Sequence, residues 1–435
     1  NNARIDRFRI PPMAAGNFNV YGGIYRDVRI MVKDRLHIPF QGSADHEGGT
    51  FVTTPDIRKE KSAVRVRTWV RNDHAEICDC TLLTTILDPD GKQAQSIKTA
   101  RHIEPGKTLE FDQTTPPIAN PHLWSLETPF VYTVISEVMA GDRLADRFES
   151  PLGFRWFRWD KAEQRLYLND RPVDIHGTNR HQEYPWLGDA IPKWISRMDM
   201  DDIRHNLNHN FMRTAHYSHD SIIYDYADRQ GIIICEEVPN IKNQDFNTDV
   251  QRQQAKEMIR RDRNHPSIFF WSVGNETDHA ADSAWIVAED TTRIVHARCV
   301  EGPSAGKFVT HTHEDMNMEQ LLKCTIRGWY DDDVKNLPGT TQVTGNEELQ
   351  HSRALANEGL TWRHGVMWLY EDHGADREYA NSPLKHVNPK GWVDSWRIPK
   401  YMYYLWQANH AEKPMVFIHP HYWRSQYLGQ NKDFI

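Results

Sequence analysis

The chain shows two different patterns of apolar and polar residues. Between about residues 36 and 155, short segments alternate the two kinds of side chain, as in 63–70 and 80–87. Alternation with a period of two is typical of strands that bury one face. Asp-Pro-Asp-Gly at 88–91 and Glu-Pro-Gly-Lys at 104–107 separate these segments, and both favour turns. This part of the chain is therefore predicted to form a β-sandwich of roughly 100 residues.

From residue 156 to about residue 410, short apolar runs alternate with helical patterns. The predicted strands cover 173–177, 211–214, 232–235, 268–271, 307–310, 324–327, 342–344 and 365–368. Helices are expected over 196–208, 220–230, 251–263, 281–299 and 401–408. Eight strand–helix units predict an α/β fold, the (β/α)8 TIM barrel. The interval between the sixth and seventh strands has room for only a minimal helix.

Both ends of the sequence indicate further domains. Residues 21–30 alternate after paired glycines, which predicts the last strand of a sheet. A single strand is not stable alone, so we expect its partners to lie upstream. An apolar run at 414–418 predicts the first strand of another β domain over 411–435.

Composition narrows the possible classes of function. The formal charge of -8 leaves no basic footprint for nucleic acid, and no run of about 18 apolar residues could span a membrane. The five cysteines are sparse and odd in number, which argues against a disulfide framework or a zinc site. The compartment stays open, with the periplasm or secretion preferred to the cytoplasm. The 15 Trp and 16 Tyr include side chains suited to stacking on sugars.

Polar and aromatic side chains follow the predicted barrel strands. In a barrel of parallel strands these ends meet at one face, where barrel enzymes carry their active sites. The set comprises His181, Arg213, His216, Glu237, Asn275, Glu276, Tyr330, Glu347, Glu348 and Trp368. Carboxylates that follow the fourth and seventh strands would therefore face each other across the barrel mouth.

Two facing carboxylates favour glycoside hydrolysis. A separation of about 5–5.5 Å gives a retaining mechanism with one acid/base and one nucleophile, and a wider separation gives inversion. The acid needs a raised pKa, whereas Arg213 is placed to keep the nucleophile ionised. From spacing alone, Glu276 could instead cap the next helix.

The order of motifs resembles glycoside hydrolase family 2, which contains β-galactosidases, β-glucuronidases and β-mannosidases. The resemblance covers essentially the whole chain and rests on 21–28, 123–132, 153–155, 168–170, 177–181, 213–217 and 264–276. The last of these, from Asn-His-Pro to Gly-Asn-Glu, resembles the acid/base signature of the family. The resemblance implies the end of a jelly-roll sugar-binding domain at 1–35, an immunoglobulin-like sandwich at 36–155 and a catalytic barrel at 156–410.

The resemblance also implies roles for the residues at the barrel mouth. Glu276 is the expected general acid/base, and Asn275 is expected to hydrogen-bond the 2-hydroxyl of the sugar. The nucleophile is Glu347 or Glu348, because adjacent strand residues face opposite ways and only one can point inward. Glu347 fits the distance from its strand, and Glu348 has an apolar residue after it. Tyr330 is expected to hydrogen-bond the nucleophile.

The substrate class depends on Asn388 and Lys390. These residues resemble the Asn-x-Lys motif of the family's β-glucuronidases, which holds the carboxylate of the sugar. Lysine suits a carboxylate as a point charge, and asparagine can orient it. The alternative is a surface turn, because Asn-Pro-Lys-Gly has ordinary turn composition. His386, Trp392 and Trp396 are expected to line the same subsite.

These observations predict a retaining exo-β-glycosidase that removes a terminal β-linked sugar, preferably a uronic acid. The first alternative is a β-galactosidase that acts on oligosaccharides from an acidic or sulfated polysaccharide. A non-catalytic carbohydrate-binding protein is a more distant one. No cofactor is expected, and no metal either, because 241–244 lack the Glu and His that bind magnesium in the family's β-galactosidases. The expected partner is a glycoside or oligosaccharide, with a homo-oligomer left open.

Overall fold

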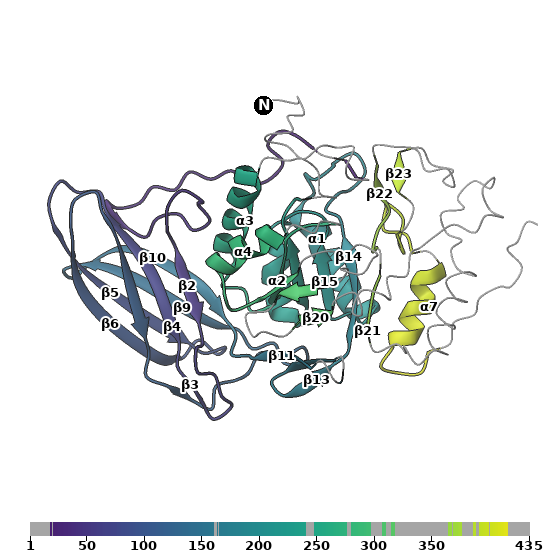
Figure 1. Cartoon of the computed structure of the whole chain (residues 1–435), viewed down its shortest axis with the longest axis horizontal. Coiled ribbons are helices and arrows are strands. Elements are labelled where there is room, and N and C mark those ends of the chain that lie inside the picture. Colours follow the sequence, from purple (N-terminus) through teal and green to yellow (C-terminus); the bar gives the residue numbers. More distant parts are fainter. Residues whose placement is uncertain are drawn as a thin grey trace, which may run out of the picture.

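The computed structural model describes a β-sandwich followed by an α/β domain (Figure 1). The described residues are 18–19, 21–160, 163, 165–240, 248–275, 280–296, 307–309, 315–317, 364–367, 369–375, 386–388, 391–399 and 401–415. Within these ranges no helix is long and apolar enough to cross a membrane.

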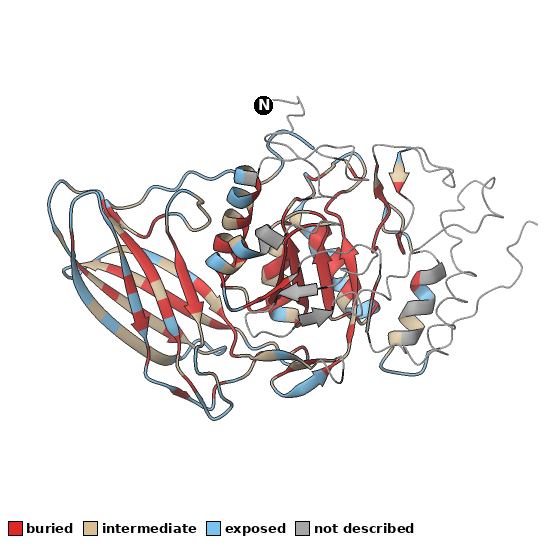
Figure 2. Cartoon of the chain, in the orientation of Figure 1, coloured by how far each residue is buried: buried red, intermediate tan, exposed pale blue. Residues whose placement is uncertain are grey.

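The sandwich consists of two antiparallel sheets, as the alternating pattern predicts. One sheet contains β1 (Leu36–His37), β4 (Arg65–Asn72), β2 (Thr50–Thr53) and β7 (Thr108–Thr114). The other contains β10 (Arg143–Leu152), β9 (Tyr132–Ala140), β5 (Cys78–Leu87) and β6 (Gln93–Ile103). Inward-facing residues of both sheets, such as Val66 and Ile86, share one buried cluster. The alternation of buried and exposed residues along the strands is visible in Figure 2.

A small antiparallel sheet connects the sandwich to the α/β domain. It contains β11 (Phe157–Asp160), β12 (Arg165–Leu168) and β13 (Arg171–Val173). Leu166 and Leu168 are buried in one cluster with Phe269 and Phe270 of the barrel. The first barrel strand therefore begins at Ile175, two residues later than the start predicted from the sequence.

The parallel strands of the barrel lie side by side in chain order, with the eighth predicted strand next to the first, and all but the last in the series are predicted from the sequence. They are β21 (His364–Met367), β14 (Ile175–Arg180), β15 (Phe211–Thr214), β16 (Ile233–Glu237), β17 (Ile268–Ser272) and β18 (Ile294–His296). Every residue of β15, β16 and β17 is buried (Figure 2). Burial along the whole length of a strand is typical of parallel strands that are covered on both faces.

Helices follow the strands where the sequence predicts them. They are α1 (Lys193–Asp201), which continues as the π-helical turn η2 (Asp202–Asn206), α2 (Ile222–Gln230), α3 (Thr248–Asp262), α4 (Ala280–Glu289) and α7 (Tyr401–His410). Helix α2 ends at Gly231, whose left-handed backbone (φ 69°) is the usual conformation of a glycine C-cap.

The helix predicted over 281–299 is wrong beyond Glu289. Asp290 ends the helix. Its carboxylate accepts hydrogen bonds from the backbone NH and from the hydroxyl of Thr292, each with a donor–acceptor distance of 2.7 Å. This is the local turn chemistry of aspartate, which competes with the helix. Ile294–His296 then forms β18, parallel to β17. The segment predicted as the fifth parallel strand instead forms β19 (Lys307–Val309), which is antiparallel to β18 and pairs with β20 (Asp315–Asn317).

Residues 21–34 form no strand, contrary to the prediction. Ile24, Val28 and Ile30 of this segment are 85%, 74% and 93% exposed. No described strand pairs with the segment, and an extended segment without a hydrogen-bonding partner is not a strand. The strands predicted at 324–327, 342–344 and 414–418 lie wholly or mainly outside the described residues.

Candidate active site

Arg213 connects its own strand, β15, to three other barrel strands at their carboxyl ends. Its guanidinium donates hydrogen bonds to these neighbours. Nε donates to Oε2 of Glu237 at a distance of 2.7 Å, and Nη1 donates to Oδ1 of Asn179 at 3.0 Å. Nη2 lies 2.5 Å from Oε2 of Glu237 and donates to Oδ1 of Asn275 over 3.1 Å. Asn179 is on β14, Arg213 on β15 and Glu237 on β16, and Asn275 follows β17. One side chain thus holds the polar ends of four neighbouring strands in register.

Glu237 is the buried anion that balances this charge. Its side chain is fully buried, and it also accepts a hydrogen bond from the hydroxyl of Ser272 over 2.7 Å. Nδ1 of His216 lies 2.8 Å from Oε1, and because a carboxylate can only accept, Nδ1 carries the proton. Burial raises the pKa of the Glu237 carboxyl, but Arg213, His216 and Ser272 lower it more, to about 2. The carboxylate is therefore ionised throughout the neutral range.

The orientation of the Asn275 amide follows from its contact with Arg213. A guanidinium has only donors, so the oxygen of the amide must face it, and the NH2 group points away. The backbone NH of Asn275 donates to the carbonyl of Asn240 over 2.7 Å. Gly274 permits this approach, because its φ is +141° and a Cβ there would lie 2.3 Å from the same carbonyl. The site therefore presents an amide donor at the end of β17.

Histidine rings form the other wall of the site. His181, which follows β14, is 1% exposed and stacks on His373 with ring centroids 4.1 Å apart. It meets the ring of His216 edge-on at 5.1 Å and the ring of Phe18 at 5.1 Å. Burial first, and then the neighbouring cationic groups, hold the pKa of His181 well below its usual range. The His181 ring is therefore held in its neutral form.

Asn388 lies in the same wall, on a short hairpin. Strand β23 (Val387–Asn388) pairs with β22 (His373–Gly374), and Nδ2 of Asn388 lies 3.0 Å from Nε2 of His373. Asn388 is 1% exposed, so the surface-turn alternative is wrong for this residue. The hairpin places it two side chains from His181, in the neighbourhood that the sequence predicts.

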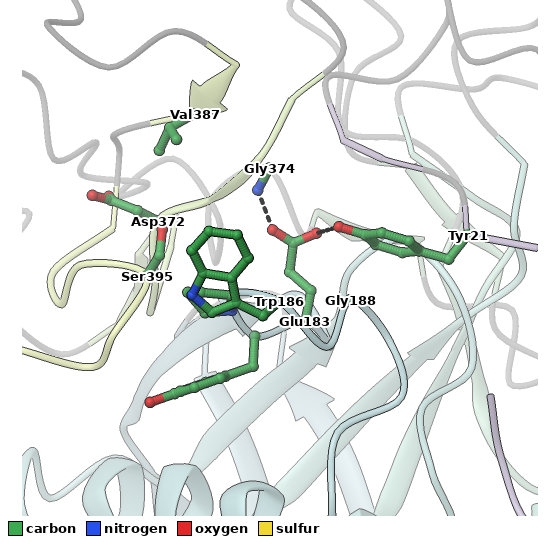
Figure 3. A pocket seen from close by; sticks show the side chains of 10 residues that line it. Tyr21, Glu183, Trp186, Gly188, Asp372, Gly374, Val387 and Ser395 are labelled. Atoms are coloured by element: carbon green, nitrogen blue, oxygen red, sulfur yellow. Dashed lines mark hydrogen bonds between the residues drawn. The ribbon is translucent and has the colours of Figure 1, made fainter.

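A pocket of about 340 Å³ opens beside this hairpin (Figure 3). Its lining combines residues from the chain start, the loop after β14 and the segments around the hairpin: Tyr21, Glu183, Tyr184, Pro185, Trp186, Gly188, Asp372, Gly374, Val387 and Ser395. Glu183 lies between two donors, the backbone NH of Gly374 and the hydroxyl of Tyr21. Burial raises the pKa of Glu183 despite these hydrogen bonds. The Glu183 carboxyl thus links the loop after β14 to Tyr21 and to strand β22.

Of the other residues predicted to line the site, some lie near the pocket, one is buried in the core, and the rest are outside the described residues. Trp392 does not line the subsite: it is 1% exposed in the hydrophobic core, since the chain turns inward after Gly391. Trp396 is 48% exposed, and its ring meets that of Tyr184, a pocket residue, edge-on at 5.7 Å. His386 is exposed. Outside the described residues lie Glu276, Tyr330, Glu347, Glu348, Trp368, Lys390 and the stretch 241–244.

His373 is not among the site residues predicted from the sequence, and Glu237 is predicted without a specific role. His373 follows the eighth predicted strand. Polar residues that follow the strands of a barrel gather at one face, so the same reasoning places His373 in the site. Glu237 was recognised as a strand-end carboxylate, but its partnership with Arg213 depends on side-chain directions that the sequence does not contain. Arg213 was expected to face the nucleophile; in the structure its described partners are Glu237, Asn179 and Asn275.

The buried Arg–Glu pair and the amide donor lie at the carboxyl ends of the strands, the face where barrel enzymes carry their active sites. The family models agree: residues 161–338 match "Glycosyl hydrolases family 2, TIM barrel domain", and residues 49–155 match "Glycosyl hydrolases family 2". The chain belongs to glycoside hydrolase family 2. The family and the barrel fold predicted from the sequence are thereby confirmed.

Named relatives fall into two groups. A β-glucuronidase of Formosa agariphila is 25% identical over 97% of this chain and 47% of its own length. A β-galactosidase of Thermoanaerobacter pseudethanolicus is 26% identical over 92% of this chain and 55% of its own length. The crystal structure of a Bacteroides uniformis β-glucuronidase has the same fold, with a TM-score of 0.78 and 24% identity over 95% of this chain and 55% of that one. The chain thus spans about half the length of these relatives.

Proposed function

We propose that the protein is a retaining exo-β-glycosidase that removes a terminal β-linked sugar, with a uronic acid as the preferred sugar. The observation that carries this proposal is the hydrogen bond from Arg213 to Asn275, which turns the amide NH2 of Asn275 away from the guanidinium. An amide donor beside the acid/base position is what a barrel glycosidase needs to hold the 2-hydroxyl, and that contact strengthens in the transition state.

In the proposed mechanism, two carboxylates act in turn. Glu276, next to Asn275, protonates the glycosidic oxygen while Glu347 or Glu348 attacks the anomeric carbon and forms a glycosyl–enzyme ester. The aglycone leaves as an alcohol. Glu276 then removes a proton from water, which attacks the same carbon and releases the sugar with its configuration retained. The Arg213–Glu237 pair keeps Asn275 in position through both steps.

The uronate preference is supported by Asn388 and by the neighbouring Lys390. Asn388 lies in the wall that contains His181 and His373, and a lysine two residues later would supply the cation for a carboxylate. Two of the relatives are named β-glucuronidase, which also supports a uronic acid as the substrate of this chain.

Two alternatives remain. Relatives named β-galactosidase favour a galactosidase, which would act on oligosaccharides from an acidic or sulfated polysaccharide. A non-catalytic carbohydrate-binding protein is less well supported, because both positions expected to carry the catalytic carboxylates are occupied by glutamates in the sequence.

The test compares initial rates on aryl β-glucuronide, β-galacturonide and β-galactoside for the wild type and for Lys390→Ala. We expect a uronide to be the best substrate. We expect Lys390→Ala to reduce kcat/KM for it by at least about tenfold, the loss of one charge-assisted hydrogen bond. Lys413→Ala, which removes an exposed lysine after α7, is the control and should change nothing. A preference for the neutral galactoside that Lys390→Ala leaves unchanged would exclude the uronate specificity.

A further inference from the structure

A second cleft lies where the sandwich meets the barrel, at the opposite end of the strands from Asn275. Its volume is about 580 Å³, which is within the range of small-molecule sites. The lining includes Pro266, just before β17, and Ile294, the first residue of β18. Parallel strands begin at one face of a barrel and end at the other, so this cleft lies roughly 15 Å from the mouth, the length of a five-residue strand. It is therefore separate from the candidate active site.

All of the charged residues described in the lining of the cleft are arginines, and one of them, Arg158, pairs with Asp160 over a distance of 2.9 Å. Five arginines contribute to it, and none of the described residues that line it is acidic: the arginines are Arg65, Arg67, Arg155, Arg158 and Arg293. The whole chain, in contrast, has a formal charge of -8. A concentration of one sign of charge in a concave site attracts ions of the other sign.

Two of these arginines are held close together by neutral acceptors. Arg155 donates to the carbonyls of Pro266 and Ile268, and Arg293 donates to the same carbonyl of Ile268 over 3.2 Å. The nearest carboxylate oxygen that pairs with Arg293 belongs to Asp290, 3.8 Å away. Burial, and then the charge of Arg293, hold the pKa of Arg155 well below its usual range. Carbonyl dipoles compensate two like charges only partly, so an anion in the cleft would be stabilised.

Arg65 and Arg67 are already oriented for binding at the edge of the cleft. Each presents Nε and Nη2 to one carboxylate of β7, Asp112 for Arg65 and Glu110 for Arg67, over 2.6–2.9 Å. Neither acid lines the cleft. A bidentate carboxylate fixes the plane of a guanidinium while Nη1 stays on the other side of the fork, where a further acceptor can reach it. Ordering these side chains on binding would therefore cost little entropy.

The remaining lining residues suit a sugar better than a small inorganic ion. Phe51, Trp156 and Phe157 offer aromatic surface, and Thr53 and Thr54 offer hydroxyl groups. Aromatic rings pack against the apolar faces of sugar rings, and hydroxyls exchange hydrogen bonds with theirs. We propose that this cleft is a second carbohydrate site, which binds an acidic saccharide through the arginines away from the site of hydrolysis.

The test is direct binding, measured by calorimetry at low and at moderate salt. The probes are an α-linked tetragalacturonate, which carries carboxylates and has no β-linkage to cleave, a sulfated carrageenan tetrasaccharide, neutral maltotetraose and inorganic sulfate. We expect at least one acidic tetrasaccharide to bind, more weakly as salt screens the charges, and maltotetraose not to bind. Which acidic probe binds will distinguish carboxylate from sulfate recognition.

The variant Arg65→Gln/Arg67→Gln should weaken that binding by at least about tenfold, because two charged donors are lost. Arg71→Gln is the matched control: Arg71 lies on the same strand β4 and pairs with Asp73, but it does not line the cleft. These exposed ion pairs contribute little to stability, so all variants should fold. Hydrolysis of a small aryl glycoside should be unchanged in the double variant, which separates this proposal from the one on catalysis. Binding of inorganic sulfate alone, or acidic binding unaffected by the double variant, would overturn it.

Discussion

Arg213 donates a hydrogen bond to Oδ1 of Asn275 over 3.1 Å and so links the second barrel strand to the end of the fourth. The same guanidinium is anchored by Glu237, which is fully buried and ionised. The orientation of Asn275 therefore depends on a carboxylate that is not expected to touch the substrate itself.

Replacing Glu237 should reduce both activity and stability. Glu237→Gln leaves the buried charge of Arg213 without its partner, which typically costs about 3–5 kcal/mol of unfolding free energy. Displacement of Arg213 and Asn275 should also lower kcat/KM by roughly 10²-fold. Denaturant unfolding and steady-state kinetics measure the two effects.

The matched control is Glu236, the neighbour of Glu237 on the same strand. Burial raises its pKa well above the usual range, and it accepts a hydrogen bond from the hydroxyl of Tyr224 over 2.7 Å. Nη2 of Arg261 lies 3.4 Å from Glu236 but only 2.6 Å from Asp262, so this guanidinium keeps a carboxylate partner when Glu236 is replaced. Glu236→Gln should therefore cost far less unfolding free energy than Glu237→Gln and leave kcat/KM nearly unchanged. Equal losses in both variants would contradict the role given to Glu237.

In the variant Asn275→Ala the enzyme should no longer discriminate between substrates with and without the 2-hydroxyl. For the wild type, a 2-deoxy glycoside should react roughly 10²–10³-fold more slowly than the parent glycoside, because the contact is worth several kcal/mol in the transition state. In Asn275→Ala the two substrates should react at similar rates. Asn388→Ala is the control: it should raise KM but keep the difference between the two substrates. A difference that persists in Asn275→Ala would mean that another group binds this hydroxyl.

A cluster of three histidines should make the fold sensitive to acid. His176, at the start of β14, and His410, at the end of α7, have ring centroids 4.4 Å apart, and His209 lies 5.3 Å from His410. Burial lowers the pKa of all three, to about 3 for His410. In the unfolded chain these rings bind protons near pH 6.5, so the native state loses stability as the pH falls below that value.

For His410 alone the loss should be about 2 kcal/mol at pH 5 relative to pH 7.5. The unfolding free energy from urea titrations at the two pH values measures it. His410→Gln, which cannot be protonated, should show a smaller loss between the two pH values than the wild type. An equal loss would place the acid sensitivity elsewhere.

The nucleophile can be assigned by chemical rescue. Glu347→Gly and Glu348→Gly each remove one carboxylate, and only the true nucleophile leaves a cavity in which azide can attack the anomeric carbon. For Glu347→Gly, and not for Glu348→Gly, we expect azide to restore turnover of an activated aryl β-glycoside. Azide attacks the anomeric carbon from the face that the carboxylate occupied and displaces the aglycone, so the product is the α-glycosyl azide. Rescue of Glu348→Gly alone reverses the assignment.

The sequence predicts several of the parallel strands to within one or two residues. Their apolar runs are short and have polar residues at both ends. The segment Phe211–Thr214 forms a strand with the predicted bounds, and the strand at Ile268 extends by one residue. The prediction failed after Glu289, where an aspartate turn outweighs helical periodicity. Partnerships such as Arg213 with Glu237, and the burial of Trp392, depend on the packing of distant segments, and no local pattern encodes them.

The central claim is that Glu276 is the general acid/base of a retaining glycosidase. The most direct measurement is the hydrolysis by Glu276→Gln of two aryl β-glycosides of the preferred sugar, one with a good and one with a poor leaving group. A missing acid matters most when the leaving group needs a proton, so kcat/KM should fall by about 10²–10⁴-fold for the poor leaving group and far less for the good one, while binding of a sugar inhibitor persists. Equal activity of Glu276→Gln and the wild type on the poor leaving group would contradict the account.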